Sequence, residues 1–344
     1  MNTNENSNTT HQISTEKQSL EYTQFSTRYD FELSTIWCYM HPAPRPCVNI
    51  NLIDELIHLQ KQLTITYKNQ RSDNIWPFRH FVLASQIPNI YSLGGDLALF
   101  KNYISNKEED KLREYAHKCV NLQHRNIDNL DLPITSVSLI QGQALGGGFE
   151  MALSCDVIIA ERSSQLGFPE IMFNLFPGMG AYNLLTRRIG PSLAERIILS
   201  GKTYHATELY DMGIIDLIAE DGQGVQATEN YLKSHNQSHN TIRSIKKIRQ
   251  LVHPITQENL YEIVNIWVDA AMNLSEKDLA KMERLLHLQR NFKNSEILQE
   301  NNTSFTPRRG EWRKVKDATF PLITHLGERI KRNRRKKESR RKKI

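Results

Sequence analysis

Apolar residues along the chain follow two spacings that predict strands and helices in turn. Short apolar runs typical of buried strands occur at residues 48–52, 81–85, 137–140 and 157–160. Apolar residues at helical spacing follow at residues 53–63, 108–122 and 257–289. Strands that alternate with helices predict an α/β fold, and a chain of 344 residues is long enough to bury a substantial core.

Three consecutive glycines stand where a predicted strand passes into a predicted helix. Residues 134–140 alternate apolar and small polar side chains, and residues 148–155 carry apolar side chains at helical spacing. Gly146-Gly147-Gly148 is therefore expected at a helix N-terminus, where free N–H groups and the helix dipole favour negative charge. A plain glycine turn leading into a buried helix is the alternative, and the glycines alone do not decide between the two.

A second glycine-rich turn follows the predicted strand at residues 81–85. Residues 92–96 read Ser-Leu-Gly-Gly-Asp and are able to present another free N–H group. Two N–H donors that converge from separate loops form an oxyanion hole, which stabilises the negative oxygen of a thioester enolate. The two glycine-rich turns together therefore predict a site for oxyanion chemistry.

Two glutamates occupy compatible positions beside these turns. Glu150 follows the triple glycine, and Glu170 follows Pro169 twenty positions later, which leaves room for a helix, a strand and a return. Both carboxyl groups are thus able to face one cavity, where neighbouring acids push their pKa values apart and divide acid and base roles. For an isolated glutamate at a helix start, the alternative is a solvated partner of the helix dipole.

These motifs, in this order, resemble the crotonase superfamily, which includes enoyl-CoA hydratases, isomerases and related acyl-thioester enzymes. The resemblance covers roughly residues 25–295 and rests on residues 92–96, 142–150, 155–156, 166–170, 176–178 and 206–215. It implies an α/β, crotonase-like (ClpP/crotonase) spiral of ββα units with a C-terminal helical region.

The resemblance also implies roles for single residues. Leu93 and Gly147 would supply the N–H groups of the oxyanion hole, and Gly94 and Gly148 would lie against the substrate. By the same resemblance Glu150 and Glu170 would be the catalytic acid and base, in either order, and Asp96 would be structural. The resemblance implies no cofactor, and the four cysteines show no metal-binding spacing.

Within the superfamily the chain looks most similar to diffusible signal factor synthases, which make cis-2-unsaturated fatty acid messengers. The similarity rests on residues 91–100, 174–182, 266–272 and 282–284. It implies dehydration of a 3-hydroxyacyl thioester and hydrolysis to the free acid. Implied partners are an acyl carrier protein or CoA thioester, further copies of the chain in a trimer or multiple of one, and a sensor-kinase receiver domain. An enoyl-CoA hydratase or isomerase of fatty acid metabolism is the alternative.

Apolar residues near the C-terminal end suggest where an acyl chain would bind. Met179, Trp267, Met272 and Leu285 are candidates, because methionine adapts to flexible chains and tryptophan offers a large flat wall. Apolar stripes on helices are more commonly plain core, and the pattern leaves that alternative open for most of them.

The two ends of the chain differ from the rest in composition. Residues 1–24 are expected to form a disordered tail, residues 296–328 have no assignment, and residues 329–344 are expected to be a basic disordered tail. The last segment carries eleven Lys and Arg and one Glu, a net of +10, so the overall +6 leaves −4 for the rest. This tail would solubilise the protein, contact nucleic acid or an anionic membrane, or contact an acidic carrier protein. A nucleic-acid-binding protein on a crotonase scaffold is therefore a further alternative.

No apolar run is long enough to cross a bilayer, and the N-terminal region lacks the basic and apolar regions of a secretory signal. A soluble, cytoplasmic protein is expected.

Overall fold

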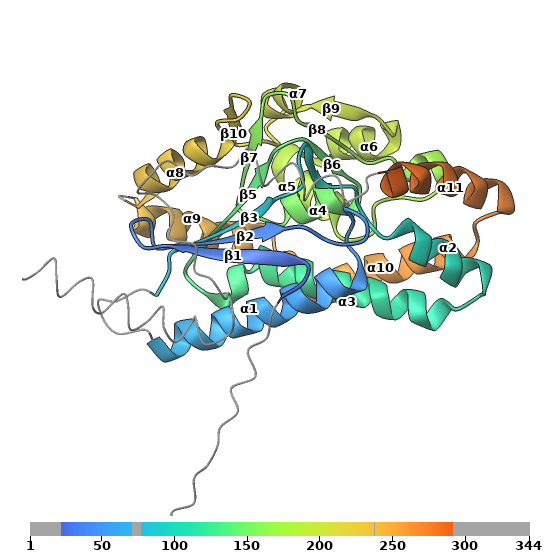
Figure 1. Ribbon diagram of the computed structural model, residues 1–344, viewed down its shortest axis with the longest axis horizontal. Helices are drawn as coiled ribbons and strands as arrows, with labels where there is room; N and C mark the ends of the chain where they lie inside the picture. Colours follow the sequence, from blue (N-terminus) through green and yellow to red (C-terminus); the bar gives the residue numbers. More distant parts are fainter. Residues whose placement is uncertain (1–21, 71–76, 237, 292–344) are drawn as a thin grey trace, which may run out of the picture.

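The computed structural model describes residues 22–70, 77–236 and 238–291, which form two sheets surrounded by helices (Figure 1). The larger sheet has the order β1-β2-β3-β5-β7-β10, and all neighbours are parallel except the antiparallel pair β1 and β2. Its strands are β1 (Phe25–Asp30), β2 (Thr35–Met40), β3 (His80–Ser85), β5 (Thr135–Ile140), β7 (Val157–Glu161) and β10 (Leu217–Ala219).

The smaller sheet has four short strands in the order β4-β6-β8-β9. They are β4 (Ile90–Ser92), β6 (Gln143–Leu145), β8 (Gln165–Gly167) and β9 (Thr203–His205). Strands β3, β5 and β7 of the larger sheet are each followed by a strand of the smaller sheet, and helices follow those pairs. This repetition is the expected spiral of ββα units, so the fold prediction is confirmed.

Helices cover both faces of the larger sheet (Figure 1). The described helices up to the middle of the chain are α1 (Ile50–Gln70), α2 (Leu97–Ser105), α3 (Glu109–Ile127), η1 (Asn129–Asp131), α4 (Gly147–Leu153) and η2 (Glu170–Phe173). Those that follow are α5 (Ala181–Ile189), α6 (Pro191–Ser200), α7 (Ala206–Asp211), α8 (Gly224–His235), α9 (His239–Val252), α10 (Gln257–Met272) and α11 (Glu276–Asn291). The predicted C-terminal helical section is thus two helices, α10 and α11.

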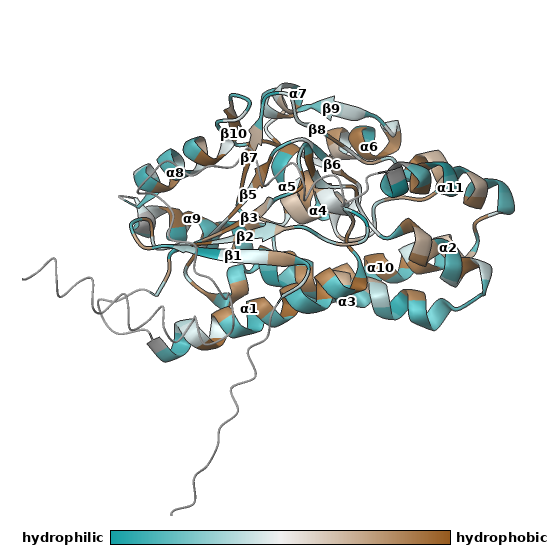
Figure 2. Ribbon diagram, in the orientation of Figure 1, coloured by the Kyte–Doolittle hydropathy of each residue, from teal (hydrophilic) through white to brown (hydrophobic). Residues whose placement is uncertain are grey.

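The central strands are apolar on both faces because both faces are covered. In β3, Val82 packs into a cluster that includes Leu232 of α8, while Leu83 packs into the main core with residues of α1 and α3. Successive side chains of a strand point to opposite faces, so each central strand supplies both cores and reads as a continuous apolar run. Figure 2 shows the central strands in brown and the surrounding helices with brown and teal stripes.

The strand predicted at residues 48–52 is wrong. Val48 forms only an isolated bridge to Gly95, and α1 begins at Ile50. The reason is local: the side chain of Asn49 accepts a hydrogen bond from Leu52 N at 2.9 Å, which caps the first turn of a helix. Strands β1 and β2 were not predicted from the sequence.

The N-terminal boundary at residue 25 also needs correction. Thr23 N and Gln24 N donate to the Glu55 carboxylate, and the side chain of Gln24 accepts a hydrogen bond from Ala43 N at 3.1 Å. Residues 22–24 therefore belong to the folded domain. The rest of the predicted N-terminal tail and everything assigned beyond residue 291, including the basic tail, lie outside the described residues. None of the described helices is both long and apolar enough to cross a membrane.

Candidate active site

The loop between β4 and α2 is fixed by hydrogen bonds that leave one amide open. Leu93 N donates to Pro46 O at 2.8 Å, and Val48 N donates to Gly94 O at 2.8 Å. Within the described part of the chain, Gly95 N–H donates no hydrogen bond to protein. An ideal Cβ placed on Gly147 would lie 3.4 Å from the Gly95 nitrogen, so the two backbones approach each other closely.

Leu93 as an oxyanion-hole donor is therefore wrong, because its N–H group is already bonded to Pro46 O. Gly95 has the open N–H group instead, opposite Gly147, which opens α4 and whose N–H has no intrahelical acceptor. Gly94 has φ +89°, a conformation that favours glycine and turns the following peptide. The two successive glycines were the available signal in the sequence, whereas the prediction named Leu93, the residue before them.

The triple glycine proves to be more than a plain turn. Gly146 has φ +51°, and an ideal Cβ on it would lie 2.4 Å from Glu170 Oε1, so the absence of a side chain makes room for that carboxylate. A Cβ on Gly147 would lie 2.2 Å from Met179 Cε. An ideal Cβ on Gly148 would lie 2.6 Å from Ser92 Cβ, so Gly148 packs on Ser92 instead, and it does not line the cavity described below. Its assignment to substrate binding is therefore wrong.

Glu150 is buried in α4 and its carboxylate is held by two backbone amides. Oε1 accepts hydrogen bonds from Met179 N at 2.7 Å and Ala181 N at 3.0 Å. Burial raises the pKa of Glu150 to about 7, although the two amides act in the opposite direction by stabilising the charged form. The carboxylate is thus fixed in orientation and retains a proton affinity suited to neutral pH.

Glu170 begins η2 and turns its carboxyl group into the same cavity. Glu170 as a whole residue is half-buried. Its Oε2 atom, however, is fully buried and has no hydrogen-bond partner among the described residues. Burial first, and then the charge of Glu150, raise the pKa of Glu170 to about 8. Because the charge of Glu150 adds to the effect of burial on the pKa of Glu170, Glu170 keeps its proton to a higher pH than Glu150, and the pair can offer one acid and one base.

These groups line a cavity of about 200 Å³ whose walls are mainly apolar. The predicted site residues that line it are Leu93, Gly94, Gly147, Glu150, Glu170, Met179, Trp267 and Leu285. Met272 does not; it is partly buried and packs against the main core, so the prediction for Met272 is wrong. The predicted N–H groups, carboxyls and apolar wall thus converge, with Gly95 in place of Leu93 as donor.

Part of the apolar wall escaped the sequence analysis. It comes from α2 and α3, with Phe100, Tyr115, Ala116 and Cys119. Phe100 stacks edge-on against both Tyr115 and Trp267, at centroid distances of 5.3 and 5.1 Å. An amphipathic pattern marks one buried face of α3, but residues that line a cavity have the same apolar character as residues of a filled core.

The sequence as a whole also matches a known family. The model of the enoyl-CoA hydratase/isomerase family matches residues 46–290, which is most of the chain. The chain belongs to the enoyl-CoA hydratase/isomerase family. Enzymes of this kind act on acyl thioesters, in agreement with an oxyanion hole beside two carboxyl groups.

Individual relatives agree with this membership. Enoyl-CoA isomerase/hydratase fer4 of Mycosarcoma maydis is 31% identical over 179 residues, which cover 52% of this chain and 62% of the relative. Mitochondrial methylglutaconyl-CoA hydratase of Mus musculus is 31% identical over 168 residues, covering 48% of this chain and 50% of the relative. The chain thus spans about half to three fifths of the length of these two curated relatives.

Solved structures support the same fold. DspI of Pseudomonas aeruginosa is 26% identical, with a TM-score of 0.58 over 73% of this chain and 97% of DspI. Human mitochondrial delta3-delta2-enoyl-CoA isomerase has a TM-score of 0.64 over 78% of this chain and 99% of that structure. Its 18% identity makes it evidence for the fold alone.

Proposed function

We propose that this member of the family dehydrates a 3-hydroxyacyl thioester and hydrolyses the product to a free cis-2-unsaturated fatty acid, which serves as a quorum-sensing signal. The observation that carries the proposal is the pair Glu150 and Glu170 in one apolar cavity, beside the open N–H groups of Gly95 and Gly147. The proposal has two chemical steps.

In the first step one carboxylate removes the α-proton of the thioester. The thioester oxygen then becomes an enolate oxygen, which the N–H groups of Gly95 and Gly147 stabilise. The other carboxyl group gives its proton to the 3-hydroxyl, the C–O bond breaks, and water leaves. The pair has exchanged one proton for another, so its total number of protons is unchanged.

In the second step the same hole holds a tetrahedral oxyanion. A glutamate accepts a proton from water while the water oxygen attacks the thioester carbon. The C–S bond then breaks, and the glutamate returns the proton to the departing sulfur, which releases a thiol and the free acid. The signal-synthase assignment rests on the motif resemblance of residues 91–100, 174–182 and 266–272.

Product analysis tests the proposal. The purified protein is incubated with 3-hydroxyacyl thioesters of acyl carrier protein and of CoA, and the products are identified by mass spectrometry and NMR. Free cis-2-enoic acid is the expected product. A thioester-bound trans-enoyl or hydroxyacyl product would instead identify a hydratase or isomerase of fatty acid metabolism, and would contradict the proposed synthesis.

Further partners are proposed on the same resemblance. They are an acyl carrier protein or CoA thioester as substrate, further copies of the chain in a trimer or a multiple of one, and a sensor-kinase receiver domain, in a cytoplasmic setting. The proposed contacts of residues 329–344 with anionic surfaces or nucleic acid concern a segment outside the described residues. A pull-down with the cognate kinase that shows no association would remove the receiver domain from this set.

Trp267 is expected to set the length of the acyl chain. Its ring is buried against Gly178, where an added Cβ would lie 2.4 Å from Trp267 Cγ, and against Phe100. Trp267→Phe would enlarge the cavity, so we expect kcat/KM for longer chains to rise relative to shorter ones by about tenfold, the effect of one or two methylene groups in an apolar pocket. Competition between acyl chains of different length measures the ratio.

A matched control is Trp37→Phe, because Trp37 is equally apolar and fully buried but lies in β2, away from the cavity. It should leave the chain-length ratio unchanged. The same ratio in wild type and Trp267→Phe would exclude Trp267 from the acyl pocket.

A further inference from the structure

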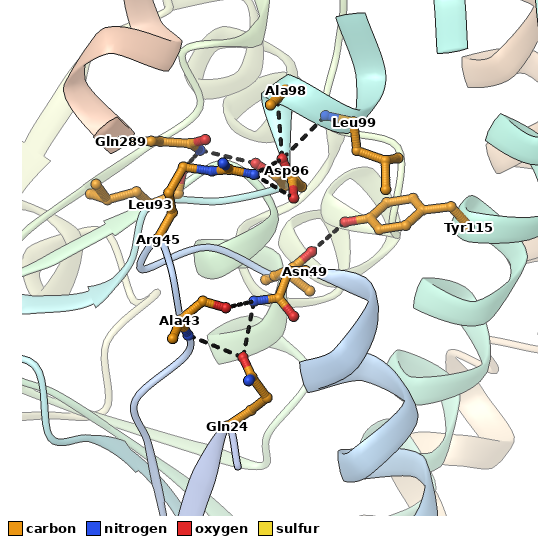
Figure 3. A network of polar contacts seen from close by, with 12 residues as sticks. Gln24, Ala43, Arg45, Asn49, Leu93, Asp96, Ala98, Leu99, Tyr115 and Gln289 are labelled. Atoms are coloured by element: carbon orange, nitrogen blue, oxygen red, sulfur yellow. Dashed lines mark hydrogen bonds and ion pairs between the residues drawn. The ribbon is translucent and has the colours of Figure 1, made fainter. Parts of the chain in front are cut away.

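The side chain of Gln289, in α11, contacts the loop between β4 and α2, residues 93–96, which is called the oxyanion loop below (Figure 3). The side chain is 2% exposed, and its Nε2 lies 2.9 Å from Leu93 O and 2.9 Å from Gly95 O. Both of these atoms are acceptors, so the NH₂ group must face the loop and the carbonyl oxygen Oε1 must point elsewhere. The orientation of this amide is therefore fixed by its partners.

The loop is held on its other sides by the N-terminal part of the chain. Arg45 Nη2 lies 2.6 Å from Asp96 Oδ1, which also accepts hydrogen bonds from the first amides of α2 (Figure 3). Val48 N donates to Gly94 O. With Gln289 in place, the carbonyl oxygens of residues 93–95 are all bonded, and Gly95 N–H is left without an acceptor among the described residues.

The bond to Gly94 O has a direct effect on that open amide. Gly94 C=O and Gly95 N–H belong to the same peptide group, so a donor on the oxygen polarises the N–H and strengthens the hydrogen bond it makes to an oxyanion. This benefit requires that the peptide keep its orientation. Gln289 fixes the carbonyl groups on either side of that peptide, those of Leu93 and Gly95.

The other end of the Gln289 amide has no such partner. Oε1 is buried, and no donor among the described residues reaches it. Gln289 also lines the cavity, together with Gly95, Gly147 and Leu285. A buried carbonyl oxygen without a donor is unfavourable and is normally satisfied by protein, water or ligand.

We propose that Gln289 is a positioning residue of the oxyanion hole and that its Oε1 accepts a hydrogen bond from the substrate's pantetheine arm. The arm is common to CoA and acyl-carrier-protein thioesters, and the donor nearest the thioester is the amide N–H two methylene groups beyond the sulfur. On the acyl side of the thioester, the 3-hydroxyl is also a donor, but it has to reach Glu150 and Glu170. The proposal rests on the proposed function only in requiring an acyl thioester as ligand.

Two substrates separate the two parts of this proposal. A 3-hydroxyacyl N-acetylcysteamine thioester carries the amide, and the corresponding S-butyl thioester lacks it. Gln289→Leu should lower kcat at least tenfold for both thioesters, because the loop loses the two hydrogen bonds that Gln289 donates to it. In wild type we expect KM to be lower for the amide-bearing thioester than for the S-butyl thioester. Gln289→Leu should abolish this difference in KM. Gln289→Asn, which withdraws the amide by one methylene, is the second variant and should behave alike if the leucine variant does not fold.

Gln60→Leu is the matched control. Gln60 is also 2% exposed and donates through Nε2 to Leu122 O and Asn126 Oδ1. Its buried Oε1 has no partner in the described part of the chain, but Gln60 does not line the cavity. It should leave kcat and the preference for the amide-bearing thioester unchanged. A kcat for the Gln289 variants within twofold of wild type, or a retained preference for that thioester, would overturn the proposal.

A readout without turnover keeps this test independent of the proposed function. A 3-oxoacyl N-acetylcysteamine thioester has no 3-hydroxyl to lose; it forms an enolate when an oxyanion hole polarises it, and the enolate has an ultraviolet absorption band that is read directly after mixing. We expect the band in wild type and Gln60→Leu and its loss in Gln289→Leu; equal bands would overturn the role of Gln289. Wild type that forms the band but dehydrates no 3-hydroxyacyl thioester would contradict the proposed function, while the comparison of bands still decides on Gln289.

Discussion

Replacing either active-site glutamate by glutamine is expected to lower kcat by about three orders of magnitude, the usual contribution of a positioned acid or base. Glutamine has nearly the same shape as glutamate but neither accepts nor gives up a proton at neutral pH. In Glu150→Gln the group between Met179 N and Ala181 N loses its charge, and in Glu170→Gln the carboxyl that keeps its proton to the higher pH is lost. Steady-state kinetics with a 3-hydroxyacyl thioester measures the effect.

The matched control for this experiment is Glu195→Gln. Glu195 is exposed in α6 and accepts a hydrogen bond from Tyr182. It does not line the cavity that holds Glu150 and Glu170. Its turnover should equal that of wild type. If Glu150→Gln or Glu170→Gln kept near-normal turnover with an intact fold, that residue would not be the acid or base.

Glu170→Gln is also expected to stabilise the protein at pH 8 and not at pH 4. Glu170 in the folded protein has a pKa raised from 4.5 to about 8, mainly by burial. Between these two values the unfolded chain has lost the proton that the folded chain keeps, so the folded state binds more protons and its stability falls as the pH rises. Glutamine never ionises and removes this loss.

The expected gain in free energy of unfolding is about 2–3 kcal/mol at pH 8, below the bound of about 5 kcal/mol that the whole pKa change would give. Urea unfolding at both pH values measures it. The decisive quantity is the difference between the change in free energy of unfolding at pH 8 and the change at pH 4. Any contact that glutamine gains or loses contributes equally at both pH values and cancels in this difference. Glu195→Gln should show no such difference, and an equal change at pH 4 and pH 8 for Glu170→Gln would mean that the carboxyl is not held protonated by the fold.

The fold and the two glutamates could be predicted from the sequence because their signals are local. Strand β5 is an apolar run that ends in a turn, and the glycines before Glu150 mark a backbone that must be approached closely. The spacing of Glu150 and Glu170 fits the helix, strand and return that the structure contains, α4, β7 and β8. These patterns do not depend on distant parts of the chain.

The donor of the oxyanion loop could not be chosen in this way. Every residue except proline has an N–H group. The difference between Leu93 and Gly95 is that the N–H of Leu93 donates to Pro46 O, in a loop far upstream, whereas the N–H of Gly95 stays open. The same reason applies to Met272: a helical stripe identifies a buried residue but not whether it faces filled core or a cavity. Gln289 gave no signal at all, since its partners lie 194 and 196 positions earlier.

That separation has a consequence for biosynthesis. Because Gln289 follows its two partners by 196 and 194 positions, the loop at residues 93–95 can gain its last two hydrogen bonds only after residue 289 has left the ribosome. A message cut short before codon 289 would therefore yield a product whose turnover is no higher than that of Gln289→Leu.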